Sequence, residues 1–363
     1  MITILDEEAV QKKIRHGGFR SLLKRAVRYG IEVALLSEEG EKALIRMRHG
    51  GKSFFMNGAN APAWKLMTNL TRDKEMTKLI LNEVGVEVPK GFVADSTESA
   101  LRAMREGVLR YPVILKPTHG SMSRGVSWDI RNASELRQAI RDFRSAKREH
   151  DFKRDTFLVE EMFVGREYRL LVFKGSVIAC TEKTPASVTG TGVSTVRELI
   201  EAFNDSRPAG YKLRLDEVAM DTLKRERLTT DSVVEAGRTV RLRNNMNMTD
   251  GGRAINSLHL MHPSFRDICI RSMEIAGLDF AGIDFLVKDI SAEAEPGNYV
   301  VLEVNCNPYY NMHEAPLVEG GDTDVSSILL EEIFPSLRND TKRHDTIGTV
   351  DIDSPETGTA TAL

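Results

Sequence analysis

Cysteine is scarce in this chain of 363 residues. The three cysteines, Cys180, Cys269 and Cys306, are widely spaced, so they form no CxxC pair and predict no disulfide framework. This usage is typical of a reducing compartment, and we expect the protein in the cytoplasm. Cys306 has two interpretations, a reactive thiol or a small buried residue, and the second is the commoner role of a free cysteine.

The sequence also lacks a strong net charge and a long apolar run. Its formal net charge is −3, from 50 Lys and Arg against 53 Asp and Glu, and the two signs are mixed. Without a basic stripe or a basic amphipathic segment, we expect neither a nucleic-acid partner nor a membrane surface. No apolar run approaches the about 20 residues of a membrane span. The N-terminus turns acidic at once, so we expect no secretory signal.

Strand-like and helix-like segments alternate along the chain, which is typical of an α/β (α+β) fold. We predict a small N-terminal α/β domain at 1–72, a second domain at 73–162 and a third at 163–338. The remainder, 339–363, is polar and has few large apolar groups. It cannot bury enough surface to order itself, and we predict a flexible tail.

Polar residues interrupt two apolar segments near the C-terminus, at 280–287 and 299–308. Asp284 lies in the middle of the first segment, where an ionised carboxylate is costly unless it has a partner. In the second segment, Glu303 and Asn305 are two residues apart, so on a strand they point to the same face.

The connection at 288–298 contains Pro296-Gly297 and predicts a hairpin between these two strands. A simple hairpin places Asp284 directly opposite Glu303, with Asn305 close by. Carboxylate and amide oxygens that converge in this way suit Mg²⁺. A surface hairpin with scattered polar residues is the alternative, because antiparallel strands often have one polar face.

A phosphate-binding pattern occurs in the second predicted domain. Lys116 ends an apolar strand and precedes a loop of small residues, so it can hold a phosphate as a point charge beside backbone N–H groups. A helix that begins near residue 73 places Lys74 and Lys78 one turn apart. An ordinary strand end and turn is the alternative, because neither a Walker A motif nor a dinucleotide fingerprint is present. The candidate loop residues are Gly120, Ser121, Ser123 and Gly125.

The segment 158–169 combines an apolar strand, acidic residues and a short apolar linker. Adenine can lie against the linker residues Met162 and Phe163 while backbone groups bond its edge. A carboxylate of Glu160, Glu161 or Glu167 can accept from ribose hydroxyls. A solvated strand end with a weak surface ion pair is the alternative.

Taken in order, these features resemble the ATP-grasp superfamily. Segments 190–200 and 247–252 look like the ATP-grasp module of cyanophycin synthetase, and 312–316 looks like the C-terminal half of bifunctional glutathione synthetase. Two features depart from these patterns, because Gly190-Thr191-Gly192 lacks an acidic residue and Arg253 is a basic residue that we do not expect there. The partner halves of those bifunctional enzymes have no counterpart, so we expect neither reaction to be complete in this chain.

The resemblance implies roles for the candidate residues. Lys74, Lys78 and Lys116 would contact ATP phosphates beneath a closing loop that contains Gly120, Ser121, Ser123 and Gly125. Glu160, Glu161, Met162, Phe163 and Glu167 would surround adenine and ribose. Asp284, Glu303 and Asn305 would bind Mg²⁺, for which Mn²⁺ can substitute. The catalytic candidates, which would face phosphate or the acyl substrate, are Arg169, Lys183, Asn247 and Arg253.

The implied activity is that of an ATP-dependent carboxylate–amine ligase. It would release ADP and form an amide bond on an amino acid or short peptide through an acyl phosphate. Its partners would be small-molecule carboxylate and amine substrates, and we expect a homodimer. Two alternatives remain: a ligase that loads an amino acid onto a carrier protein or another large molecule, and a non-catalytic ATP-binding regulatory protein. Retention of all three candidate metal ligands argues against the second.

Overall fold

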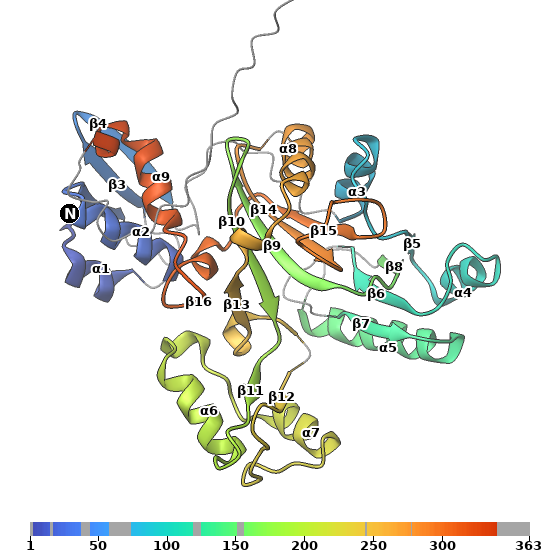
Figure 1. Ribbon diagram of the computed structural model, residues 1–363. Coiled ribbons are helices and arrows are strands. Elements are labelled where there is room, and N and C mark those ends of the chain that lie inside the picture. Colours follow the sequence, from blue (N-terminus) through green and yellow to red (C-terminus); the bar gives the residue numbers. More distant parts are fainter. Residues whose placement is uncertain are drawn as a thin grey trace, which may run out of the picture.

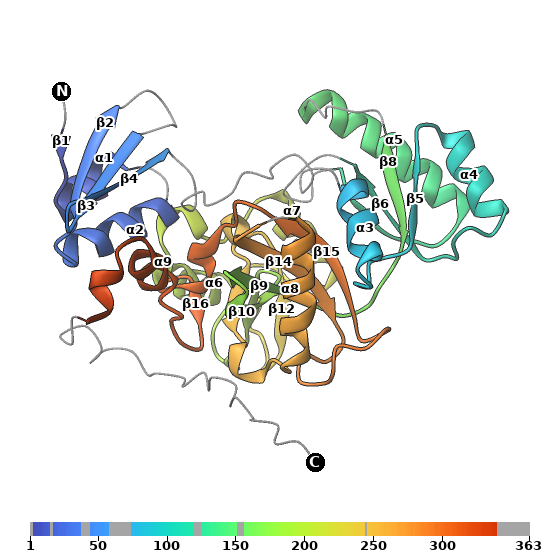
Figure 2. The same ribbon diagram turned by 90° about the horizontal axis from the view of Figure 1, so that it is seen from above.

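The computed structural model describes eight segments of the chain. Three units lie in a row and a fourth projects from the middle one (Figure 1), and the row is also visible from above (Figure 2). None of the helices in these segments is long and apolar enough to cross a membrane. The first predicted domain boundary and nearly all of the predicted tail lie outside the described residues. The described residues are 3–14, 17–37, 44–57, 74–118, 125–150, 156–243, 245–276 and 278–339.

The N-terminal unit contains residues from both ends of the described chain. Its antiparallel sheet has the strand order β1-β2-β3-β4, and α2 packs against β2. Helix α9 packs against α2, so that Leu22 and Leu329 are buried in one core. Asp6 caps α1 by accepting from the N–H of Ala9 at 2.7 Å. The elements are β1 (Thr3–Ile4), α1 (Glu7–Lys13), α2 (Gly17–Arg28), β2 (Glu32–Ser37), β3 (Leu44–His49), β4 (Lys52–Asn57), α9 (Val325–Ile333) and η5 (Pro335–Asn339).

The second unit is an antiparallel sheet with the strand order β5-β8-β6-β7 and helices α4 and α5 on one face. Val113 and Leu115 of β6 pack in the core beneath these helices. Because side chains alternate along a strand, Lys116 points to the opposite face. The elements are β5 (Gly91–Ala94), α4 (Thr97–Arg105), β6 (Val113–Pro117), β7 (Ser127–Ile130), α5 (Ala133–His150) and β8 (Phe157–Glu161). Helix α3 (Lys74–Glu83) precedes them in the chain but packs against α8 (Ser264–Ala276) and β15 (Tyr299–Asn305) of the central unit.

The central unit is a six-stranded sheet with the strand order β15-β14-β9-β10-β13-β16. Only the β13–β16 pair is parallel. Helix α8 packs on one face of β9, β10 and β14 and also contacts α3. The elements are β9 (Arg166–Phe173), β10 (Ser176–Thr184), η2 (Met248–Asp250), β13 (Arg253–Asn256), η3 (Leu258–Leu260), α8 (Ser264–Ala276), β14 (Phe280–Val287), β15 (Tyr299–Asn305), η4 (Tyr310–His313) and β16 (Val318–Glu319).

The predicted hairpin of β14 and β15 is confirmed. The strands are antiparallel and Asp284 pairs with Glu303. The next pair is Phe285 with Val301, so Leu302 is an extra residue in a β-bulge, which the sequence did not predict. On the other side of β14, Asp284 pairs with Arg169 of β9. The register therefore brings three charged residues from three adjacent strands together.

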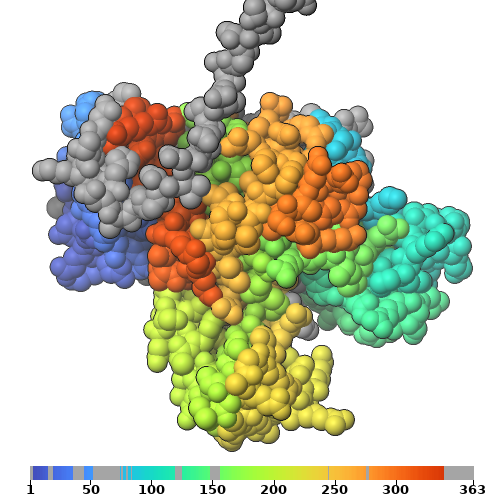
Figure 3. Space-filling model, viewed as in Figure 1, coloured from blue at the N-terminus to red at the C-terminus, as the bar shows by residue number. Residues whose placement is uncertain are grey.

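An insertion between β10 and β13 forms the projecting unit, coloured green to yellow in the space-filling view (Figure 3). It has its own small core, which includes Ile200, Leu223 and Val240. Its first helix begins at a reciprocal capping box formed by Thr195 and Glu198. The elements are β11 (Ser187–Thr189), α6 (Val196–Asp205), η1 (Ala209–Tyr211), α7 (Glu217–Arg225) and β12 (Thr239–Arg241).

Candidate active site

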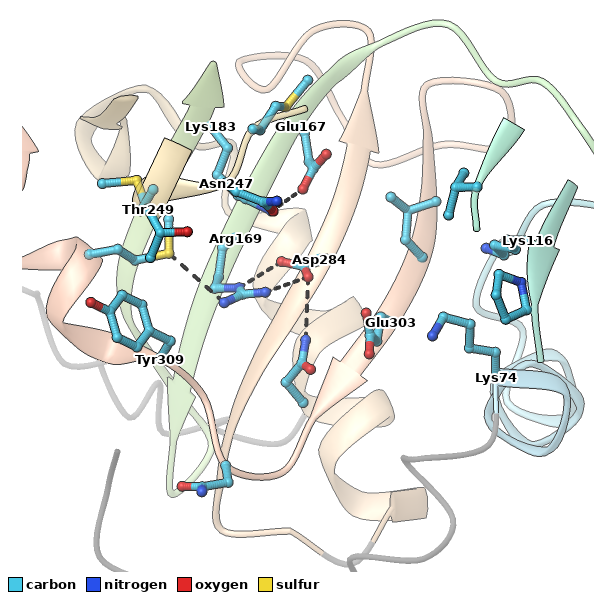
Figure 4. Close-up of a pocket in the computed structure, with 18 of the residues that line it drawn as sticks. Lys74, Lys116, Glu167, Arg169, Lys183, Asn247, Thr249, Asp284, Glu303 and Tyr309 are labelled. Atoms are coloured by element: carbon cyan, nitrogen blue, oxygen red, sulfur yellow. Dashed lines mark hydrogen bonds and ion pairs between the residues drawn. The ribbon is translucent and has the colours of Figure 1, made fainter. Parts of the chain in front are cut away.

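A cavity of about 510 Å³ lies between the central sheet and the second unit. Figure 4 shows Lys74 and Lys116 on one side and Asn247 and Tyr309 on the other. Strands β9, β14 and β15 supply the floor between these two sides. The floor is polar because polar and apolar side chains alternate along these strands. The apolar side chains point to the opposite face, which packs against α8. The cavity therefore has cations at one end and a charged floor.

Arg169 and Asp284 form a buried pair at the centre of this floor. The Arg169 Nε and Nη2 atoms donate to the two Asp284 carboxylate oxygens at 2.7 and 2.6 Å, and Asn305 Nδ2 donates to Oδ2 at 3.3 Å. Burial by itself raises the pKa of Asp284, but the charges of Arg169 and Lys183 outweigh it and hold that pKa below its usual value. Asp284 is therefore a carboxylate at neutral pH.

The chemistry of the three candidate metal ligands fits Mg²⁺. Asp284, Glu303 and Asn305 all line the cavity, and Glu303 lies between Asp284 and the lysines (Figure 4). No group of three or more His, Cys, Asp or Glu side chains in the described segments could hold an ion by itself. Two carboxylates and one amide oxygen are typical of an ion that keeps waters and shares its shell with phosphates, as Mg²⁺ does.

A second buried ion cluster lies beneath the lysine side of the cavity. The Glu160 carboxylate contacts Lys78 and is 2.7 Å from Lys116 Nζ, and its side chain is only 2% exposed. Burial lowers the pKa of Lys78 to about 5, helped by the charges of Lys116 and Lys74. Burial and the charge of Lys74 lower the pKa of Lys116 to about 8. At neutral pH, Lys116 is a cation that faces the cavity beside Lys74, and Glu160 holds Lys116 in place.

Lys183 and Asn247 also face the cavity, whereas Arg253 does not. Lys183 on β10 pairs across the strands with Glu167 on β9, and both line the cavity. Asn247 begins the short η2 segment and donates to Asp250 at 3.3 Å. Arg253 is not among the lining residues. Its guanidinium instead donates to Glu319 on β16, with Nε at 2.9 Å.

The predicted nucleotide-binding residues have varied locations. Gly120, Ser121 and Ser123 lie outside the described residues, and Gly125 is a described glycine with a φ of 68°. Glu161 ends β8, and Met162 and Phe163 follow it in the connection to β9. None of the three lines the cavity. The Phe163 ring lies 5.4 Å from Lys288 Nζ. The roles assigned to all of these residues stay predictions.

Sequence reasoning missed three aromatic or imidazole side chains at this site. Trp128 lines the cavity although its side chain is largely exposed, and Tyr309 lines it from the turn after β15. His313 is fully buried and hydrogen-bonded to Thr181. Burial and the charges of Arg169 and Lys183 lower the pKa of His313 to about 3, so it is neutral. The signal in the sequence was a Trp shortly after the small-residue loop that follows Lys116.

Comparisons with known proteins show what this chain is similar to. Residues 109–186 match the model of the ATP-grasp domain. Cyanophycin synthetase of Nostoc sp. is 34% identical over 324 residues, which are 87% of this chain and 35% of that protein. The glutathione biosynthesis bifunctional protein GshAB of Mannheimia succiniciproducens is 29% identical over 335 residues, which are 88% of this chain and 42% of that protein.

A solved structure agrees with these sequence matches. The bifunctional glutathione synthetase from Pasteurella multocida is 26% identical with a TM-score of 0.68, covering 88% of this chain and 44% of that one. The chain therefore has the ATP-grasp fold, and its residues 109–186 match the ATP-grasp domain. Its relatives are named as cyanophycin synthetases and bifunctional glutathione synthetases, and it spans between a third and a half of their length.

Proposed function

We propose that this protein is an ATP-dependent carboxylate–amine ligase that releases ADP. It joins the carboxylate of an amino acid or short peptide to an amine through an acyl phosphate. One observation carries the proposal: Lys74 and Lys116 face Asp284, Glu303 and Asn305 across a single cavity. A triphosphate needs this combination of cations and oxygen ligands, because phosphoryl transfer depends on positioning and charge neutralisation.

The residues of the cavity bind different parts of the substrates. Lys116, held by Glu160, neutralises a phosphate oxygen, and Lys74 lies beside it. Asp284, Glu303 and Asn305 would hold Mg²⁺. The bound ion would polarise the terminal phosphates and stabilise charge at the γ-phosphoryl group. Arg169 projects beside Asp284 toward the centre, where it can hold the carboxylate that attacks the γ-phosphorus.

Two bond exchanges complete the reaction. A carboxylate oxygen bonds to the γ-phosphorus as the bond to ADP breaks. The amine nitrogen then bonds to the acyl carbon as phosphate leaves. Glu167 is bound to Lys183 and Asp284 to Arg169, so neither is a free base. We therefore assign the amine proton to the departing phosphate. Arg169 stabilises the oxyanion that forms during the second exchange.

The nucleotide product tests the proposal. With ATP, Mg²⁺ and a panel of amino acids, short peptides and amines, coupled assays should detect ADP and phosphate, and mass spectrometry an amide product. AMP and pyrophosphate would contradict the mechanism, because charge would then be stabilised at the α-phosphate. ATP binding without substrate-dependent hydrolysis across the panel would favour a regulatory protein.

A further inference from the structure

We infer that the acyl donor has no second carboxylate in the part of the cavity remote from the lysines. The inference rests on the proposed ligase function and names the donor's class, an amino acid or short peptide whose distal side chain bears no carboxylate. The relevant surface is the distal wall, formed by Met246–Thr249, Tyr309 and Met312. Figure 4 shows this wall opposite Lys74 and Lys116.

The side chains of the distal wall are all uncharged. Asn247 and Thr249 offer an amide and a hydroxyl, and Met246, Met248 and Met312 offer thioethers. These groups suit a donor that combines hydrogen bonding with apolar surface. A carboxylate would find neutral dipoles there but no cation.

Tyr309 is held in a network of neutral groups. Its hydroxyl is hydrogen-bonded to the hydroxyl of Tyr211, which comes from η1 of the insertion. Asn311 Nδ2 donates to Tyr309 at 2.9 Å and to Tyr211 at 3.4 Å. Two hydroxyls and one amide therefore support the wall.

The cations nearest to the distal wall already have partners in this chain. Lys183 pairs with Glu167, and their side chains are only 14% and 17% exposed. Arg169 pairs with Asp284. Glu167 cancels the charge of Lys183, so this pair brings no excess positive charge to the wall. Arg169 lies at the centre of the floor and is the group for the reacting carboxylate.

Two further arginines close to the wall are also engaged. Arg253 donates to Glu319, and Arg207 donates to the carbonyl of Gly252 through both terminal nitrogens at 2.9 Å. Neither arginine lines the cavity. A second carboxylate on the donor would therefore be desolvated without a counter-charge from the described residues, which is strongly unfavourable. An amide of the same shape would find partners in Asn247 and Thr249.

Matched donors test this inference. The panel contains dipeptide pairs that share a C-terminal carboxylate and differ only by Gln against Glu, or Asn against Asp, at the preceding residue. We expect kcat/KM from ADP release to favour the amide by at least about tenfold. Equal rates, or faster turnover of the acid, would overturn the inference while leaving the ligase function intact.

A pair of variants tests the inference through the preference for the amide over the acid, which a general loss of activity would leave unchanged. Glu167→Gln releases Lys183 into the cavity, so the preference for the amide should fall by about tenfold or reverse. Glu319→Gln is the matched control, because it releases Arg253 outside the cavity and should leave the preference unchanged. A preference unaffected by Glu167→Gln would overturn the assigned charge balance.

Binding measurements test the inference independently of the ligase function. If no donor releases ADP, the ligase proposal fails, and calorimetric titration of the same pairs still tests the wall. Tighter binding of the amide supports a neutral wall and tighter binding of the acid overturns it. A panel that neither binds nor releases ADP would overturn both proposals.

Discussion

Glu160 has two interpretations that predict different outcomes. The sequence pattern placed it beside adenine or ribose, whereas its buried carboxylate lies between Lys78 and Lys116. If Glu160 positions the lysines, Glu160→Gln should weaken the binding of ADP and leave that of adenosine, which has no phosphate, unchanged. If Glu160 contacts ribose, the affinity for adenosine should fall as well.

The expected size of the stability change follows from burial and charge. Removing one partner of a buried ion pair typically lowers the free energy of unfolding by about 3–5 kcal/mol. Two effects favour the lower end of that range. Glutamine keeps an oxygen that accepts a hydrogen bond. Lys116, with a pKa of about 8, can also release its proton at pH 7 at a cost of about 1.4 kcal/mol. We expect a loss of about 3 kcal/mol.

Denaturant unfolding measures this loss, and calorimetry measures the two affinities. Glu161→Gln is the matched control, because it makes the same chemical change at the next residue, whose side chain is half-buried and does not line the cavity. The control should change stability by less than about 0.5 kcal/mol. Unchanged stability in Glu160→Gln, or lost adenosine affinity, would refute the positioning role.

Three further predictions concern charge, metal and packing. Because burial lowers the pKa of Lys116 to about 8, the Kd for ATP should be flat below that pH and rise by up to about tenfold per unit above it. In the Lys116→Arg variant, the rise in Kd with pH should be flatter. A Kd of the unmodified protein that stays constant up to about pH 9.5 would contradict the prediction. Glu303→Gln should lower kcat by more than about a hundredfold without changing the melting temperature, and near-normal turnover would exclude a metal role. A Cβ at Gly190 would lie 2.2 Å from the Glu235 carbonyl oxygen, so Gly190→Ala should destabilise the insertion by about 1–3 kcal/mol. Limited proteolysis checks this, with Gly210→Ala as the control because its Cβ would meet nothing within 4 Å.

Local sequence patterns were sufficient to predict the metal strands. The alternation of polar and apolar residues placed Glu303 and Asn305 on one face, and the connection placed Asp284 opposite Glu303, as the strand pairing confirms. The bulge at Leu302 was not predictable, because an extra residue in one strand depends on how its neighbours pack. The caps and turns, such as the capping box at Thr195, were predictable because they depend on a few adjacent residues.

The sequence did not predict which charged side chains pair with one another. Arg253 was expected to meet substrate but binds Glu319, which is 66 residues away in the chain. Glu160 was expected near ribose but holds two lysines. Both outcomes depend on which strands become neighbours, and local periodicity contains no information about that.

The sequence by itself determined the cationic strand end at Lys116 and the hairpin that bears Asp284 and Glu303, and its resemblance to known proteins indicated the ATP-grasp class. The strand end and the hairpin depend on residue type and short-range spacing, which a strand or helix converts directly into geometry. Only the tertiary structure decided that Arg169, 115 residues from Asp284, neutralises that carboxylate. It also decided that Tyr211 supports Tyr309 in an uncharged wall. Long-range contacts form where whole units pack together, so the pairing of charges, and with it the character of the substrate cavity, arises only in the folded protein.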